Sequence, residues 1–299
     1  MPIEQVSPEL ECFLSLDQKP EQLGSGYSGE AGPAEGPVWW KEGGYLLFSD
    51  IGNNRRMKWA PDEGVTVFRE PTNYANGLTR DLQGRLIACE GGTRRVTRLE
   101  QDGKITIVAD SYNGARLNRP NDVVVKSDGS IYFTDPGAKG RPGPDLDYPG
   151  VYRVSPDLAT ITLLVRDFVL PNGLAFSPDE SILYIDDTRR RHIRAFDMQA
   201  SGALELASDR VFCDLSGHRP GFPDGMKVDT LGNVYCGGSG GIWIMSASGN
   251  HLGTIVHGGE VTTNMAWGGD DWKTLFFTTW RTLGRIELNI PGVPVPTGV

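Results

Sequence analysis

Short apolar runs separated by small polar turns recur along the whole chain. Each recurrence begins with a polar residue and an apolar run, and a turn then leads into a second β-rich run. In the third recurrence Asn121 leads the phrase, the turn lies at 128–129 and the second run spans 131–135. Third and fourth runs follow at 151–154 and 161–165. Runs of this length, bounded by such turns, are typical of β-strands.

The phrase occurs six times, with lead positions 41, 45, 51, 52 and 40 residues apart. A repeat of about 40–50 residues that holds four short strands is typical of a β-propeller blade. The sequence therefore predicts an all-β fold, a six-bladed β-propeller with four-stranded blades, as a single domain over residues 1–299. The blades are expected to start near the lead residues Glu35, Asn76, Asn121, Asn172, Asp224 and Asn264.

The sixth copy lacks a fourth strand, because the chain ends in a Pro-rich segment after the run at 285–288. That blade would keep an unpaired edge. The strand-like segment 12–16, near the other terminus, belongs to none of the six copies. We therefore expect this segment to form an N-terminal strand that completes the last blade and closes the ring.

Composition narrows the class further. The chain holds 39 Gly and 20 Pro in 299 residues, which disfavours long helices. It has no apolar run of the roughly 20 residues that span a membrane, and its start lacks the pattern of a secretory signal. The net charge of −9 disfavours nucleic acid and anionic membranes as partners, and the four Cys form no C-x-x-C pair. These features predict a cytoplasmic protein.

The six lead residues also suggest a metal site. The first strand of each blade lines the central channel of a propeller, so these residues are expected to converge on the axis. All six carry a side-chain oxygen, and Glu35 and Asp224 are acidic. Two buried carboxylates repel each other, and a divalent cation removes that penalty. Oxygen donors suit a hard ion, so we expect one divalent cation on the axis, Ca²⁺ first and Mg²⁺ or Mn²⁺ next.

Asn-Gly and Asp-Gly are also common turn residues, and a single copy would favour that interpretation. Copies one, three and six, however, read Glu-Gly-Pro, Asn-Asp and Asn-Met at the lead position. These copies share an oxygen donor but not a turn type. Six copies in phase therefore favour a metal site over a set of ordinary turns.

Four phrases resemble the senescence-marker-protein (regucalcin)/gluconolactonase family, and they lie at 34–39, 119–122, 171–179 and 223–226. The resemblance extends in order from about residue 30 to residue 290. It implies a six-bladed propeller, in agreement with the repeat count. It also implies a catalytic divalent metal, usually calcium and in some members zinc, and many members of the family hydrolyse sugar lactones.

The resemblance also implies roles for individual residues. Glu35, Asn172 and Asp224 correspond to metal ligands, and Asn121 corresponds to a fourth ligand or a substrate contact. The family's substrate-contacting Arg, two positions before that Asn, falls on Arg119. Asp224 also matches the acidic residue proposed as general base. These correspondences define the expected catalytic centre.

Further substrate contacts are expected from the rest of the ring and from one loop. Asn76 and Asn264 complete the ring and could contact substrate or ordered waters. Residues 137–148 form a long insertion in the third copy, and such loops are uncommon unless they are functional or mobile. The insertion could form a lid with Tyr148 as a substrate contact, or it could be surface decoration.

The sequence thus favours metal-assisted hydrolysis of a sugar lactone. The metal would act as a Lewis acid, and Asp224 with a bound water would form one nucleophile and base unit. One alternative is organophosphate hydrolysis at the same ion, as in the related squid-type phosphotriesterases. Another is a non-catalytic binding propeller with calcium as a structural plug. The four His lie off the lead positions, which disfavours the His-supported second calcium of the phosphotriesterases.

Overall fold

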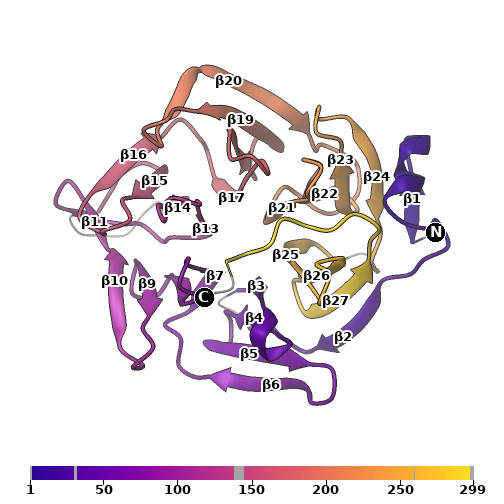
Figure 1. Cartoon of the computed structure of the whole chain (residues 1–299), viewed down its shortest axis with the longest axis horizontal. Coiled ribbons are helices and arrows are strands. Elements are labelled where there is room, and N and C mark those ends of the chain that lie inside the picture. The colour runs from indigo at the N-terminus through magenta and orange to yellow at the C-terminus, as the bar shows by residue number, and fades with distance from the viewer. Residues whose placement is uncertain (1, 30–31, 138–144, 259, 297–299) are drawn as a thin grey trace.

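The computed structural model describes residues 2–29, 32–137, 145–258 and 260–296. Within these ranges, six antiparallel sheets stand in a ring around a central axis (Figure 1). Each sheet is a meander whose first strand lies nearest the axis and whose last strand lies at the rim. The predicted six-bladed, all-β propeller is therefore confirmed.

The strands follow one another in chain order within each blade, apart from two N-terminal strands that join blades five and six. Blade one consists of β3 (Ala34–Trp40), β4 (Tyr45–Asp50), β5 (Arg55–Ala60) and β6 (Gly64–Arg69). Blade two consists of β7 (Ala75–Arg80), β8 (Leu86–Glu90), β9 (Arg95–Leu99) and β10 (Ile105–Ala109). Blade three consists of β13 (Val123–Val125), β14 (Ile131–Asp135), β15 (Gly150–Val154) and β16 (Ile161–Val165). Blade four consists of β17 (Pro171–Phe176), β18 (Ile182–Asp187), β19 (His192–Met198) and β20 (Leu204–Asp214). Blade five contains β21 (Met226–Val228), β22 (Val234–Gly238), β23 (Gly241–Met245) and β24 (His251–Ile255). Blade six contains β25 (Thr262–Gly268), β26 (Thr274–Thr279) and β27 (Thr282–Glu287). A short hairpin, β11 (Ser111–Tyr112) and β12 (Ala115–Arg116), separates blades two and three.

An N-terminal strand completes the sixth blade, as predicted, but a different segment forms it. β2 (Glu21–Ser25) pairs with β27 and closes the ring. Residues 12–16 instead cover the end of the 3₁₀-helix η1 (Pro8–Cys12) and the turn after it. Phe13 and Leu14 are buried in the core, so their apolar character serves packing and not strand pairing. A second N-terminal strand, β1 (Ile3–Gln5), adds a fifth strand to blade five.

The inner strands are buried on both faces because each blade packs between two others. β4 and β8 are buried along almost their whole length, whereas the rim strand β6 is mostly exposed. Strands covered on both faces read as continuous apolar runs, which explains the pattern seen in the sequence. Trp39 of blade one stacks on Phe276 of blade six, with ring centroids 5.3 Å apart, so aromatic packing joins the first and last blades.

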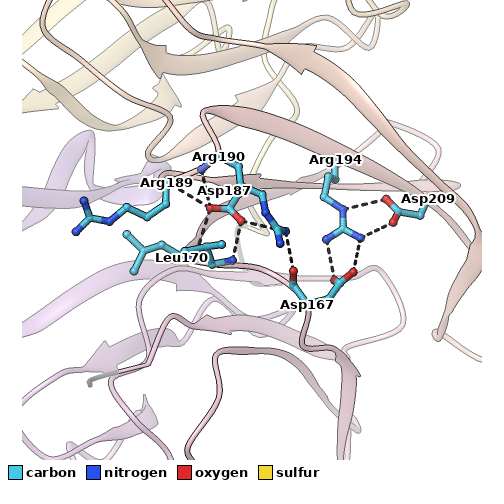
Figure 2. A network of polar contacts seen from close by, with 8 residues as sticks. Asp167, Leu170, Asp187, Arg189, Arg190, Arg194 and Asp209 are labelled. Carbon is cyan, nitrogen blue, oxygen red and sulfur yellow. Dashed lines mark hydrogen bonds and ion pairs between the residues drawn. The ribbon is translucent and has the colours of Figure 1, made fainter. Parts of the chain in front are cut away.

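A buried acidic residue ends the second strand in four blades, and it ties loops together. These residues are Asp50, Glu90, Asp135 and Asp187. The carboxylate of Asp187 accepts hydrogen bonds from the backbone nitrogens of Leu170, Arg189 and Arg190 at 3.1–3.2 Å (Figure 2). It thereby joins the loop before blade four to the turn after β18. This set of carboxylates is structural.

The loop before each first strand and the turn after each second strand lie at the same end of the channel, because each meander reverses direction at every strand. We call this end the lead face, since the lead residues lie there. The chain after β27 crosses the opposite end of the channel (Figure 1), where Gly292 N donates to Trp272 O (2.9 Å) and Val293 N donates to Val228 O (3.0 Å). Among the described residues, none of the helices is long and apolar enough to cross a membrane.

Candidate active site

The structure brings the six lead residues together at the lead face. Three amides are linked in series: Asn76 Nδ2 donates to Asn121 Oδ1 (2.5 Å), and Asn121 Nδ2 donates to Asn172 Oδ1. Asn172 also hydrogen-bonds the side chain of Asp224. These four residues come from four consecutive blades, so the phase of the sequence repeat correctly predicted their convergence. The three Asn side chains are half-buried and remain accessible to solvent.

Glu35 and Asn264 complete the ring between blades one and six. Asn264 Nδ2 donates to Glu35 Oε2 at 3.1 Å, and the same oxygen accepts from Gly36 N at 2.6 Å. Glycine at position 36 is required, because its φ is +52° and a Cβ there would lie 2.2 Å from Asn76 O. The glycine after the lead residue therefore lets neighbouring blades approach closely, which brings the lead side chains together.

Two further buried carboxylates lie in this cluster, and the sequence reasoning missed both. Asp122 Oδ2 lies 3.4 Å from Asn264 Nδ2, so side chains of opposite blades meet across the axis. Asp186 Oδ2 accepts from Gly173 N (2.8 Å), and its other carboxylate oxygen has no hydrogen-bond partner within the described ranges. Asp186 is the residue before the last in β18.

A sequence signal for Asp186 existed. The residue before the last in the second strand is Ser49 in blade one and Thr134 in blade three. Their hydroxyls donate to the backbone carbonyls of Asn76 (2.6 Å) and Asn172 (2.7 Å) in the next blade. Blade four has an aspartate at the equivalent place, so a carboxylate there faces the channel cluster and not a neighbouring carbonyl.

Burial raises the pKa of all four carboxylates. The pKa of Glu35 rises to about 7, because of burial first and the charge of Asp122 second. Burial and then the charge of Glu35 hold the pKa of Asp224 well above its usual range. Burial likewise raises the pKa of Asp186 and of Asp122. The cluster is therefore too poor in positive charge to keep these groups ionised by itself.

Among the described residues, Lys227 is a cationic side chain that lies against this cluster. Its Nζ donates to Asn264 Oδ1 at 3.3 Å, and its charge lowers the pKa of Glu35 and of Asp122. One ammonium balances one of four carboxylates. Binding of a further cation at the lead face is therefore electrostatically favourable.

The residues present fit a hard divalent ion. Glu35 and Asp224 offer carboxylate oxygens, and Asn121 and Asn172 offer amide oxygens that still have a free lone pair. In the part of the chain that the structure describes, His, Cys, Asp and Glu side chains form no group of three that could hold a metal, so the Asn oxygens have to complete the donor set. Buried oxygens of Asp186 and Asn76 without a hydrogen-bond partner in the described ranges add to the unmet demand for positive charge.

Arg119 lies on the loop that leads into Asn121. Its backbone nitrogen donates to Asp135 Oδ1 at 2.5 Å, which fixes this loop at the lead face. The side chain lies against Gly91 of blade two, where a Cβ would be only 2.7 Å from Arg119 Nε. The absence of a side chain at Gly91 thus leaves room for the arginine.

Tyr148 packs against blade three. Its carbonyl oxygen accepts from Asn118 Nδ2 (2.9 Å), and the guanidinium of Arg166 lies 5.3 Å from its ring centroid. The insertion that holds Tyr148 follows β14, so it rises from the lead face, but residues 138–144 of the predicted lid lie outside the described residues. Its role as a substrate contact stays a prediction.

Tyr74 is an exposed aromatic residue on the lead face that the sequence reasoning did not select. Its side chain is 39% exposed, and it lies two residues before Asn76. Asn73 and Tyr74 both have positive φ, at 58° and 54°. Consecutive non-glycine residues in this region are strained, and such strain clusters at functional sites. The available signal was an aromatic side chain beside a lead residue.

The fold and the cluster at the lead face together define a class of protein. Its members are six-bladed propellers whose axis ends in a ring of oxygen donors at one face. The chain belongs to the SMP-30/gluconolactonase/LRE-like family, whose model matches residues 33–281. The family suggested by the four sequence phrases is therefore confirmed.

Similar proteins include several named lactonases. A gluconolactonase of Zymomonas mobilis is 32% identical over 315 residues, covering 95% of this chain and 85% of that protein. A pentonolactonase of Haloferax volcanii is 28% identical over 253 residues, covering 82% and 80%.

Solved structures of similar fold include a named gluconolactonase. A gluconolactonase from Xanthomonas campestris superposes with a TM-score of 0.83 at 34% identity, covering 97% of this chain and 95% of that one. A calcium-binding protein, regucalcin, from Agrobacterium tumefaciens superposes with a TM-score of 0.77 at 21% identity, covering 94% and 98%. The second likeness shows the fold alone.

Proposed function

We propose that this protein is a lactonase of the gluconolactonase type, which opens a sugar lactone at a divalent cation on the propeller axis. One observation carries the proposal: two buried carboxylates with raised pKa values converge with Asn amides from separate blades at one face. The gluconolactonases that share about a third of the sequence over nearly its whole length support the reaction class.

The cation would be held by Glu35, Asn121, Asn172 and Asp224. Ca²⁺ is the first choice for this oxygen-only set, with Zn²⁺, Mn²⁺ and Mg²⁺ as alternatives. When bound, the ion supplies Lewis-acid polarisation of the lactone carbonyl.

Asp224 is the group that takes the proton of the attacking water. As a proposed ligand of the cation, Asp224 acts with the bound water as one nucleophile and base unit, in which its carboxylate orients the water and accepts its proton. The hydrogen bond from Asn172 fixes its orientation. The water oxygen then bonds to the carbonyl carbon, the ring C–O bond breaks, and the proton passes to the released hydroxyl. The product is the open-chain hydroxy acid.

The other residues of the lead face bind the sugar. Arg119 donates to the hydroxyls or the developing oxyanion of the substrate, and its fork of N–H groups suits both. Asn76 presents its amide to ring hydroxyls or to ordered waters, whereas Asn264 is buried and holds Glu35 and Asp122 in place through its Nδ2. The exposed ring of Tyr74 offers an apolar face to the carbon skeleton of the sugar.

A calcium-plugged binding propeller is less well supported. Such a protein is expected to carry an aromatic patch on its rim, for which Trp39, Trp40, Trp267 and Trp272 are candidates. Trp39, Trp267 and Trp272 are buried in the core, Trp40 is half-buried, and Trp280, outside this set, is exposed on the turn after β26. The burial of three of the four candidates disfavours an aromatic patch on the rim. The polar lead face is therefore the better-supported binding surface.

A substrate panel tests the proposed reaction. We expect metal-loaded protein to hydrolyse D-glucono-1,5-lactone with a kcat/KM at least about a hundredfold above that for diethyl p-nitrophenyl phosphate, because the relatives that share about a third of the sequence are gluconolactonases. Acid release, with the spontaneous rate subtracted, is the readout for the lactone. Faster turnover of the phosphotriester would favour the organophosphate alternative. Failure to hydrolyse any aldonolactone would overturn the proposal.

A further inference from the structure

A cavity of about 200 Å³ between blades one and two contains a buried arginine that forms no ion pair with the described residues. Arg56 of β5 and Arg69 of β6 line it from blade one, and Thr97 of β9 lines it from blade two. Arg56 is only 5% exposed, and its Nε makes no hydrogen bond in the described ranges. An unpaired buried charge is strongly unfavourable, so this arrangement calls for a counter-ion.

The rest of the molecule shows how the fold treats buried arginines. Three others are buried within the described ranges, and each has a carboxylate partner. The pairs are Arg80 with Glu42, Arg94 with Asp145, and Arg194 with Asp167 and Asp209. Figure 2 shows the last of these: Arg194 lies between two carboxylates, with Nη1 2.8 Å from Asp167 Oδ1 and Nε 2.9 Å from Asp209 Oδ1.

The charged neighbours of Arg56 act in opposite directions, because Arg69 repels its guanidinium and Glu90 attracts it. Strand pairing places Arg69 directly opposite Arg56, and like charges opposite each other in a sheet are destabilising. Burial and the charge of Arg69 lower the pKa of Arg56 to about 10, so Arg56 remains protonated at neutral pH.

Glu90, the acidic residue that lines the cavity, already has hydrogen-bond partners. Glu90 accepts hydrogen bonds from Arg95 Nε (2.8 Å), Asn73 Nδ2 (3.0 Å) and Thr97 Oγ1 (3.1 Å). Glu90 forms its ion pair with Arg95 and also attracts the guanidinium of Arg56. One carboxylate, Glu90, thus faces the guanidiniums of Arg56, Arg69 and Arg95 along the cavity wall, which leaves an excess of positive charge.

We propose that this cavity is a binding site for a small oxyanion of the phosphate type, either inorganic phosphate or the phosphate group of a small metabolite. A dianion balances Arg56 and Arg69, and a guanidinium matches phosphate oxygens with parallel N–H donors. Thr72 and Asn73, on the loop between the blades, add polar groups to the wall. The volume is below the roughly 300 Å³ of ordinary drug-sized sites, which suits a small anion. This site needs neither the axial metal nor lactone hydrolysis.

The test uses the full chain after chelator treatment, so that the axial site does not contribute. Inorganic phosphate is titrated by calorimetry and by thermal unfolding, with sodium chloride at matched ionic strength as reference. The variants are Arg56→Met, Arg69→Met and, as matched control, Arg210→Met, an exposed rim arginine paired with Asp197.

Wild type and Arg210→Met are expected to bind phosphate saturably and to gain thermal stability from it. Arg56→Met is expected to bind at least tenfold more weakly and to unfold at an equal or higher temperature than wild type without phosphate, since it removes an unpaired buried charge. Arg69→Met, an exposed change that spares the core, is expected to weaken binding in the same direction. Equal affinity in wild type, Arg56→Met and Arg69→Met would overturn the proposal, and so would no saturable binding to wild type.

A second arm identifies the source of the anion. Glucose 6-phosphate replaces inorganic phosphate in the same titrations. Tighter binding that still requires Arg56 supports the site and assigns it to a phosphorylated metabolite. Binding of inorganic phosphate alone supports the site and assigns it to the free ion.

Discussion

Replacing Asp224 by Asn is expected to lower kcat/KM for D-glucono-1,5-lactone by about a thousandfold, because the amide cannot accept the proton of water. The change also removes one of the two anionic ligands proposed for the cation. Stability is expected to hold or to rise in the chelated protein, since a buried, repelled carboxylate disappears. Acid-release kinetics and urea unfolding of the same preparation measure both effects.

Asp229 provides the matched control within the same blade. It is fully buried at the opposite end of the channel, where it accepts from Leu231 N (2.9 Å), Asn233 N (2.9 Å) and Tyr235 Oη (3.1 Å). Asp229→Asn is expected to destabilise the protein by about 2 kcal/mol while the folded fraction keeps its kcat. If Asp224→Asn keeps the full rate, Asp224 is not the base.

Chelated protein is expected to lose stability as the pH rises from about 4.5 to about 7. In this state the pKa of Glu35 is raised from 4.5 to about 7, so the folded chain holds this proton more tightly than the unfolded chain. The contribution of Glu35 is complete below pH 4.5 and disappears as the pH passes 7, by about 3 kcal/mol. Asp122, Asp186 and Asp224 act in the same direction.

The measurement is urea unfolding at pH 5, 6, 7 and 8 with chelator, comparing wild type with Glu35→Gln. The variant is expected to have the flatter profile, and added calcium is expected to stabilise wild type more at pH 8 than at pH 5. Glu42→Gln is the control: despite partial burial, the hydrogen bond from Arg80 holds the pKa of Glu42 below its usual range, so its contribution is constant over this window. Identical slopes for wild type and Glu35→Gln would contradict the account.

The phase of the sequence repeat was enough to predict most of the fold and the convergence of the lead residues. Because a propeller places equivalent positions of every blade at equivalent distances from the axis, the spacing of Asn76, Asn121 and Asn172 in the chain sufficed to predict that they meet. The hydrogen bonds that link these side chains confirm that meeting. Their roles as ligands or substrate contacts remain predictions.

Contacts between distant segments set the limit of the sequence reasoning. Residues 12–16 have a strand-like pattern, but Phe13 and Leu14 use their apolar side chains to fill the core, while the more polar β2 pairs with β27. Gly173 marks a similar limit, since a Cβ there would lie 2.3 Å from Asp224 O in the next blade. A turn preference explains such a glycine locally, but only the assembled ring reveals the close approach.

Arg56 illustrates the limit for charges. Arg56 and Arg194 each lie on the third strand of a blade, and both are buried. What separates them is the position of carboxylates from other segments, Asp167 and Asp209 at one and none within ion-pair distance at the other among the described residues. The same residue type is thus a finished structural contact in blade four and a proposed anion site in blade one.

The most direct test of the central claim is lactone hydrolysis by chelated protein to which one cation at a time is returned. Metal-free protein is expected to open D-glucono-1,5-lactone at least about a hundredfold more slowly than the calcium-loaded protein. Calcium is expected to restore the rate in wild type but not in Asp224→Asn, with zinc, manganese and magnesium compared in parallel. Full lactonase activity in protein shown by elemental analysis to contain no divalent metal would contradict the account.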